Sequence, residues 1–192
     1  MTIDMTRHQG DKNLPLVECT DTHLQTYRVR TDFQPDYDAE TGEQRGVTFI
    51  ETEFPYKPSL AEVKAFVLGV INSQTDEKIL SGLVWTPKAG GDPIPVWLST
   101  ENQANFKAAY DLAVQKNGAT LPVTFKMGED AEGNPVYHTF ETMEDADDFY
   151  ITAVAFIQQT LNEGWQKKDN FDFTPYEQAL SPVTDNTNTN EA

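Results

Sequence analysis

Alternating apolar and polar residues predict two β-strands in the first third of the chain. The alternation covers residues 24–33 and 46–56, and the stretch 34–45 between them is acidic and rich in turn-forming residues. Two alternating runs around such a stretch are typical of a β-hairpin. We therefore expect a hairpin extension over residues 21–58. The residues before it, 1–20, are polar and lack a period, which predicts a flexible N-terminal arm.

The first predicted helix begins with a capping signature. Ser59 precedes an apolar run at helical spacing, and Glu62 stands three residues further on. A serine followed by glutamate at this distance satisfies two free N–H groups at a helix start. The hydrophobic period ends at Ile71, so we expect the helix to fade over residues 72–76.

Two further helices follow from the same kind of pattern. One opens at Ser99 or Thr100 and stops at Asn117-Gly118, where both residues tolerate a left-handed backbone. The other covers residues 143–163 and is expected to end at Gly164.

Short strands are expected between these helices. Residues 78–85 form a short apolar segment that leads into a proline- and glycine-rich loop, 86–95, and residues 96–98 read as a short strand. Residues 121–127 and 136–141 predict a second hairpin.

The order of elements indicates an α+β fold, in which antiparallel β-hairpins pack with three helices. We expect one compact domain over residues 59–175, preceded by the hairpin extension. Residues 176–192 are polar and predict a flexible acidic tail.

Composition excludes several classes of function. The 192-residue chain has 14 Lys and Arg against 31 Asp and Glu, a formal charge of −17, which argues against a partner that is a nucleic acid or an anionic membrane. No apolar run is long enough to span a bilayer, and the first residues lack the apolar core of a secretory signal. The single Cys19 excludes a disulfide framework.

An acidic window invites comparison with a metal site. Eight carboxylates and no Lys or Arg lie between Glu129 and Asp148. Asp130, Glu132, Asn134 and Glu141 match ligand positions of a calcium loop, but Pro135 stands where that loop needs glycine. A hairpin turn followed by an acidic helix start explains the window better, so we expect no metal.

Other catalytic signatures are weak. Cys19 and His23 are spaced to share a helical face, yet nothing completes a metal site around them, and His8 and His138 have no matching partners. Phosphate-binding, nucleophile-elbow and zinc-protease motifs are absent from the sequence. We therefore assign no catalytic residue, cofactor or metal.

Aromatic residues are the remaining candidates. Tryptophans and Tyr150 suggest either a sugar-stacking platform or anchors of a protein interface, and the second is the commoner role. Residues 149–157 are apolar on more than one stripe, which favours self-association. The expected partner-interface residues are Trp85, Trp97, Tyr150, Phe156 and Trp165.

One block of sequence is more specific. Residues 75–85 contain Ile79 and Gly82, and residues 96–106 contain Leu98-Ser99, Gln103 and Asn105. This pattern resembles a small domain of unknown function found in tailed-phage and prophage proteins, often encoded among tail-fibre and tail-assembly genes. The resemblance covers residues 70–170, although Leu83 replaces the usual aromatic residue and the loop 88–95 is longer than usual.

The resemblance implies a non-enzymatic bacteriophage structural or assembly protein that mediates protein–protein contacts. Its expected partners are other phage structural proteins and further copies of itself, either in the virion or in the host cytoplasm during assembly. An acidic inhibitor or DNA mimic that binds a host protein is the alternative, motivated by the net charge. A carbohydrate-cleaving enzyme is a third hypothesis, supported only by scattered acids and aromatic residues.

Overall fold

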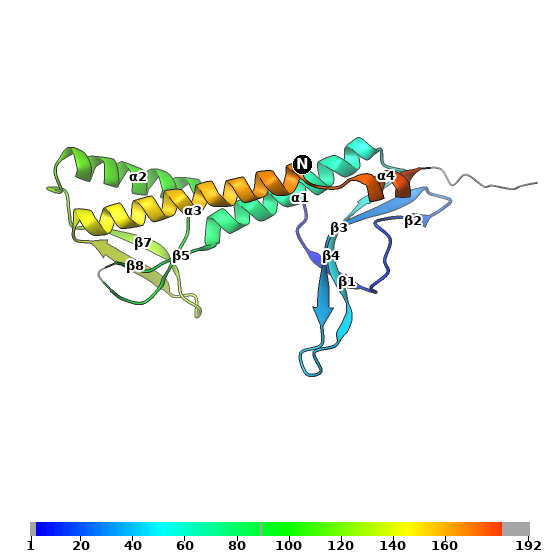
Figure 1. Ribbon diagram of the computed structural model, residues 1–192, viewed down its shortest axis with the longest axis horizontal. Coiled ribbons are helices and arrows are strands. Elements are labelled where there is room, and N and C mark those ends of the chain that lie inside the picture. The colour runs from blue at the N-terminus through cyan, green and yellow to red at the C-terminus, as the bar shows by residue number, and fades with distance from the viewer. Residues whose placement is uncertain (1–2, 89, 182–192) are drawn as a thin grey trace, which may run out of the picture. The chain divides into compact units, whose positions relative to one another are not determined.

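The computed structural model describes residues 3–88 and 90–181, and it confirms the α+β fold with antiparallel sheets (Figure 1). In chain order the elements are β1 (Arg7–Gly10), β2 (Val17–Asp21), β3 (Thr26–Tyr37), β4 (Gln44–Phe54), α1 (Leu60–Ser81), β5 (Leu83–Trp85), β6 (Ile94–Val96), α2 (Thr100–Gln115), β7 (Val123–Glu129), β8 (Pro135–Phe140), α3 (Met143–Asp169) and α4 (Thr174–Leu180).

The chain divides into two compact units rather than a domain with a hairpin extension. The first unit is Met1–Val70 with Asn170–Ala192, and the second is Ile71–Asp169. The boundary between Val70 and Ile71 falls inside α1, which therefore contributes residues to both units. The expected single domain over 59–175 therefore crosses the boundary between the two units. The hydrophobic period passes from Val70 to Ile71 without a break, so the sequence pattern did not reveal the boundary.

The first unit contains a four-stranded antiparallel sheet in the order β1-β4-β3-β2. The predicted hairpin is present as β3 and β4, with a shorter loop because β3 continues to Tyr37. The flexible arm expected over 1–20 is wrong for most of its described part, since β1 and β2 form both edges of the sheet. Strands of four and five residues are too short to display a period.

The core of the first unit lies between the sheet and helical segments. Val29 and Ile50 of the sheet and Val63 and Val67 of α1 are almost completely buried. Tyr176 of α4 is also buried, and its hydroxyl donates to the Arg30 carbonyl at 2.8 Å. The expected flexible tail therefore starts too early, because residues 174–180 form a packed helix. The rest of that prediction, residues 182–192, lies outside the described residues.

The capping box predicted for α1 is confirmed. The Ser59 N–H donates to Glu62 Oε2 at 2.8 Å, and the Glu62 N–H donates to Ser59 Oγ at 3.3 Å. The predicted fading of the helix over residues 72–76 is wrong, since α1 continues to Ser81. The stretch 72–81 contains neither glycine nor proline, and Gly82 is the first such residue after it, so nothing within the stretch forces the helix to end.

The second unit packs α2 and α3 side by side over two β-hairpins (Figure 1). The β5–β6 and β7–β8 ribbons meet where the Trp97 N–H donates to the Met127 carbonyl at 2.7 Å. The predicted cap of α2 is confirmed, because Ser99 Oγ accepts from the Asn102 N–H at 3.2 Å. Asn117 and Gly118 take the expected left-handed conformation after α2.

The expected end of the third helix at Gly164 is wrong. Gly164 is buried within α3, which runs on to Asp169. A Cβ at this position would lie 2.5 Å from Thr75 Oγ1 of α1. The glycine therefore permits a close approach of two helices, a role that depends on the neighbouring helix and not on local sequence.

Candidate interaction surface on α2 and α3

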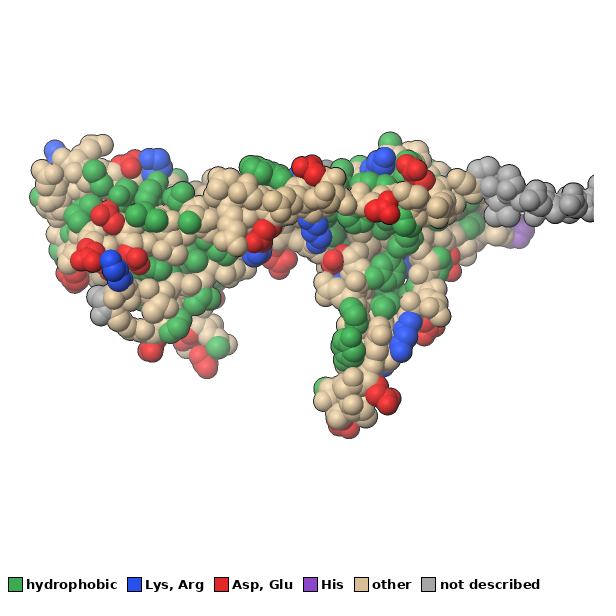
Figure 2. Space-filling model, viewed as in Figure 1, with side chains coloured by type: hydrophobic (Ala, Val, Ile, Leu, Met, Phe, Trp, Pro, Cys, Tyr) green, Lys and Arg blue, Asp and Glu red, His purple; other side chains and the backbone are tan. Residues whose placement is uncertain are grey.

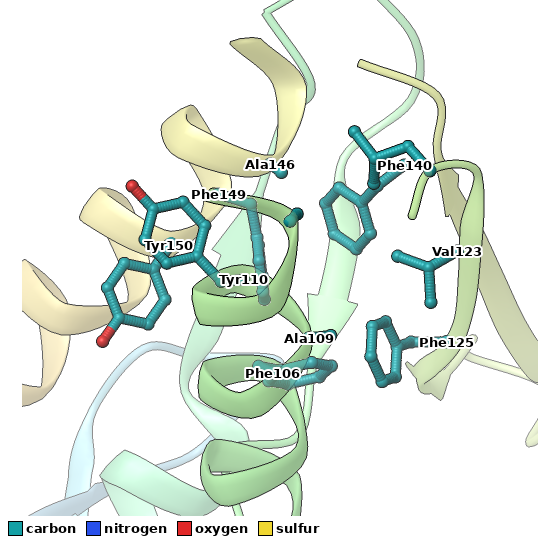
Figure 3. A pocket seen from close by; sticks show the side chains of 11 residues that line it. Phe106, Ala109, Tyr110, Val123, Phe125, Phe140, Ala146, Phe149 and Tyr150 are labelled. Carbon is teal, nitrogen blue, oxygen red and sulfur yellow. The ribbon is translucent and has the colours of Figure 1, made fainter. Parts of the chain in front are cut away.

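A tightly packed aromatic core supports the surface of the second unit. Phe106 of α2 meets Phe149 of α3 and Phe125 of β7 edge to face, with ring centroids 5.0 Å apart in each pair. The cavity among these rings leaves only about 20 Å³, and its lining is almost wholly apolar (Figure 3). Such a space holds about one water molecule, so it is a packing defect and not a binding site for an organic ligand.

Next to this core, the two helices leave an open groove of about 230 Å³. The Gln103 side chain on one wall is held by a bond from its Nε2 to the Leu98 carbonyl at 2.6 Å. The remaining lining is mainly apolar and consists of Leu98, Ala104, Phe106, Lys107, Phe149, Tyr150, Ala153, Val154 and Ile157. One cationic side chain, Lys107, lies at the rim and pairs with Asp111.

Tyr150 at the edge of the groove is fixed by a second tyrosine. Its ring stacks on that of Tyr110, with centroids 4.2 Å apart and planes inclined by 9°. A hydrogen bond with the Asp147 carboxylate, together with burial, raises the pKa of Tyr110. The two stacked rings therefore present a rigid aromatic surface.

The groove continues into an apolar stripe along the outer face of α3. Ile151 is 65% exposed, and Val154 and Trp165 are each 48% exposed. We call Ile151, Val154, Gln158, Leu161 and Trp165 the α3 stripe. Figure 2 shows hydrophobic side chains gathered over α2 and α3. Exposed apolar side chains that follow one helix face are typical of an interaction surface.

The structure brings only part of the expected interface set to this surface. Tyr150 and Trp165 lie on it. Trp85 is 2% exposed, and its indole Nε1 donates to Asp148 at 3.0 Å, so its assignment to an interface is corrected to the core. Phe156 packs against the same core, and Trp97 is half-buried with the Lys126 ammonium 5.1 Å from its ring centroid. Because Trp85 is buried, it cannot stack on a sugar together with Tyr150 and Trp165, which argues against the sugar-stacking platform.

The sequence indicated only that residues 149–157 are apolar on more than one stripe, and it did not single out Ile151 or Val154 as exposed. Both are exposed because the helix turns Phe149 and Ala153 toward the core instead. The available signal was the presence of two apolar stripes on one helix, which periodicity alone could not sort into buried and exposed.

The acidic window is divided among local structural contacts. Asp130 accepts from the N–H groups of Glu132 and Asn134 at 3.0 and 2.7 Å, and these bonds in the hairpin turn lower its pKa. Lys126 pairs with Glu129, and Lys88 with Glu144. Within residues 3–88 and 90–181, no three His, Cys, Asp or Glu side chains gather in a way that could hold a metal ion.

The Cys19 and His23 pair does not share a helix. Cys19 lies in β2 opposite Tyr27 of β3, and His23 lies in the following turn, where its N–H donates to Asp21 Oδ1 at 2.7 Å. His8 stacks on Phe49 in the sheet, with ring centroids 6.1 Å apart. Cys19, His23 and His8 therefore belong to the strands and a turn of the first unit.

His138 has a partner that the sequence did not suggest. Its Nε2 atom lies 2.7 Å from Asp145 Oδ2, and its ring meets Trp85 edge-on with centroids 5.0 Å apart. The pair joins β8 to the first turn of α3. Seven residues separate the two positions, and only the turn at Thr142 brings them together, so spacing alone carried no signal.

Comparison with protein-family models, curated proteins and solved structures finds no match. In the part of the chain that the structure describes, no helix has the length and apolar character needed to cross a membrane.

Proposed function

We propose that this chain is a non-enzymatic structural or assembly protein of a tailed bacteriophage, and that it acts through protein–protein contacts. The observation that carries the proposal is the exposure of Ile151, Val154 and Trp165 along one face of α3. Burying such side chains against another protein releases water from apolar surface, which is the main driving force of association.

The surroundings of the stripe support this role. The aromatic core beneath it holds α3 rigidly, and the stacked Tyr110 and Tyr150 rings continue the apolar surface toward α2. A rigid aromatic surface loses little conformational entropy when it binds. The resemblance of residues 70–170 to a tail-region phage domain supplies the proposed setting, with other phage structural proteins as partners in the virion or during assembly in the host cytoplasm.

The alternative of a DNA mimic has less support. A mimic needs free carboxylates in a phosphate-like row on one face. Here Asp130 serves a turn, while Asp145 and Asp148 bond to His138 and Trp85. These three carboxylates have local structural partners, so they are not free members of such a row.

The test is affinity isolation of the tagged full-length chain from cells infected by the phage that encodes it, followed by mass spectrometry. We expect phage structural proteins to co-purify with the wild-type chain. Val154→Glu should reduce this recovery at least tenfold, because it places a charge on the stripe. Val84→Glu is the matched control, since Val84 is 61% exposed on β5 and does not belong to the α3 stripe.

Two results would contradict the proposal. One is equal recovery of the phage proteins with Val154→Glu and the wild type. The other is that neither particles nor isolated complexes contain the chain together with any phage structural protein.

A further inference from the structure

We infer that the α3 stripe binds a second copy of this chain, with the two α3 helices antiparallel. The inference deepens the proposed function and rests on it, because it names one partner of the same surface. Residues of the stripe follow one another at intervals of three, four, three and four from Ile151 to Trp165. This alternation keeps the side chains on one seam and is the spacing that allows two helices to interlock.

Opposite charges extend the seam at its two ends. Asp147 stands four residues before Ile151, and Lys168 stands three residues after Trp165, so both continue the same spacing. Asp147 bonds to the Tyr110 hydroxyl, and Lys168 Nζ donates to Asn72 Oδ1 at 2.9 Å. Each group has further capacity, because a carboxylate has several acceptor positions and an ammonium has three donors.

These charges favour one relative direction of the two helices. A parallel pair would place Lys168 beside the second Lys168, and Asp147 beside the second Asp147. An antiparallel pair places the acidic end of each helix beside the basic end of the other, and it also aligns the helix dipoles favourably. Because each chain carries a formal charge of −17, such local complementarity is needed to offset repulsion between copies.

The length and the centre of the seam suit a two-fold interface. Asp147 to Lys168 spans about 32 Å at 1.5 Å per residue, so both seams match over their whole length. Gln158 lies near the middle, flanked by apolar residues of the stripe on both sides. A single amide within an apolar seam is a device that specifies register between paired helices. The resulting contact uses the same patch on both copies and closes on itself.

The first test is sedimentation equilibrium of the full chain over a range of concentrations. We expect a species of twice the chain mass of 21.6 kDa. Val154→Glu should weaken the dimer on the order of 100-fold, because each copy would bury an unpaired carboxylate in the seam. Val84→Glu should leave the association constant within about twofold, because Val84 lies outside the seam, and far-ultraviolet circular dichroism checks that both variants fold.

The second test determines direction. In an antiparallel pair, Lys168→Glu weakens the dimer by placing acid beside acid, and Asp147→Lys added to it restores the affinity. In a parallel pair, Lys168→Glu would only replace one like-charge contact with another, and Asp147→Lys added to it would restore nothing, because residue 147 would lie beside residue 147. The restoration should fade at high salt, since partly exposed charges are screened.

Cross-linking provides an independent readout in a Cys19→Ser background. Gln158→Cys lies near the two-fold axis and should form a disulfide-linked dimer on mild oxidation. Trp165→Cys lies far from its counterpart in an antiparallel pair and should remain unlinked. Equal linkage at both positions would indicate a parallel pair and overturn the inference.

A wild-type chain that stays monomeric at all concentrations would overturn the second copy as partner. That result leaves the proposed function testable on its own, because recovery of phage structural proteins from infected cells measures a different association. Loss of that recovery with retained dimerisation would be the opposite outcome, in which only the proposed function fails.

Discussion

Gly164 on α3 and Thr75 on α1 face each other so closely that a Cβ on the glycine would lie 2.5 Å from Thr75 Oγ1. The threonine is not free to move away, because its hydroxyl donates to the Ile71 carbonyl at 2.8 Å within α1. Lys78 and Glu163 pair across the same two helices at 2.6 Å. The contact therefore sets how closely the two helices pack within the second unit.

Gly164→Ala should destabilise the second unit by about 1–3 kcal/mol, the usual effect of forcing a methyl group into a packed site. Alanine alone would favour a helix by about 1 kcal/mol, so the sign of the change reports on packing. All three tryptophans lie in the second unit, so urea unfolding followed by their fluorescence measures this unit directly.

Thr75→Ala is the control for that substitution. It removes the two Thr75 side-chain atoms nearest to the new methyl group, at 2.5 and 3.0 Å, so the double variant should be more stable than the sum of the single effects predicts. Additive effects, or a stabilising Gly164→Ala, would show that the helices do not meet as closely as described.

Arg30 should be essential to the sheet of the first unit. Its side chain is 4% exposed, and its guanidinium bonds to Glu18 at 2.6 Å and to Glu51 at 3.0 Å. Arg30→Ala leaves Glu51 without its closest partner in a shielded site, so we expect a loss of about 3–5 kcal/mol. Hydrogen exchange of the β3 and β4 amides measures the change.

Arg45 provides the matched comparison for Arg30. Its side chain is 57% exposed and pairs with Asp36 in the same hairpin. Arg45→Ala should cost less than about 1 kcal/mol, because water screens an exposed pair. Similar losses for the two variants would contradict the special role of Arg30.

Tyr176 should make the first unit sensitive to alkaline pH. Burial raises the pKa of Tyr176 above its ordinary value, because the phenolate would lose hydration. The folded state then holds its proton at pH values where the unfolded chain has released it. Tyr176 therefore makes its full contribution to the free energy of unfolding below about pH 10, the pKa of tyrosine in the unfolded chain. This contribution falls as the pH rises toward the pKa of Tyr176 in the folded state.

Tyr176→Phe should remove that alkaline loss and lower stability at neutral pH by about 1 kcal/mol, because the bond to the Arg30 carbonyl is gone. Urea unfolding at pH 7 and pH 11, followed by hydrogen exchange or circular dichroism, compares the two proteins. Parallel pH profiles for wild type and variant would argue against this titration.

Gln103 and Asn105, two residues of the phage-like pattern, should differ in their effect on stability. Gln103→Ala removes the bond to the Leu98 carbonyl and should cost about 1 kcal/mol. Asn105 is exposed on α2, so Asn105→Ala should stay within about 0.5 kcal/mol. Tryptophan fluorescence during urea unfolding distinguishes them, and a larger loss for Asn105→Ala would reverse our interpretation of the pattern.

Local signals predicted much of the fold. Ser59 with Glu62, the helix start at Ser99, and the turn at Asn117-Gly118 lie where the sequence placed them. These features depend on hydrogen bonds and backbone conformations within a few residues, so the necessary information is contiguous. The short edge strand β1 could not be predicted in this way, because its pairing with β4 is long-range.

The amino-acid sequence by itself determined the α+β class, the β3–β4 and β7–β8 hairpins and the starts of α1, α2 and α3, because periodicity and capping are properties of neighbouring residues. Tertiary structure alone decided that Gly164 packs under Thr75, that His138 meets Asp145, and that Val154 faces outward. The physical reason is that a helix with two apolar faces can bury either one. Which face meets the core depends on residues distant in the chain, and the face left outside is the candidate interaction surface.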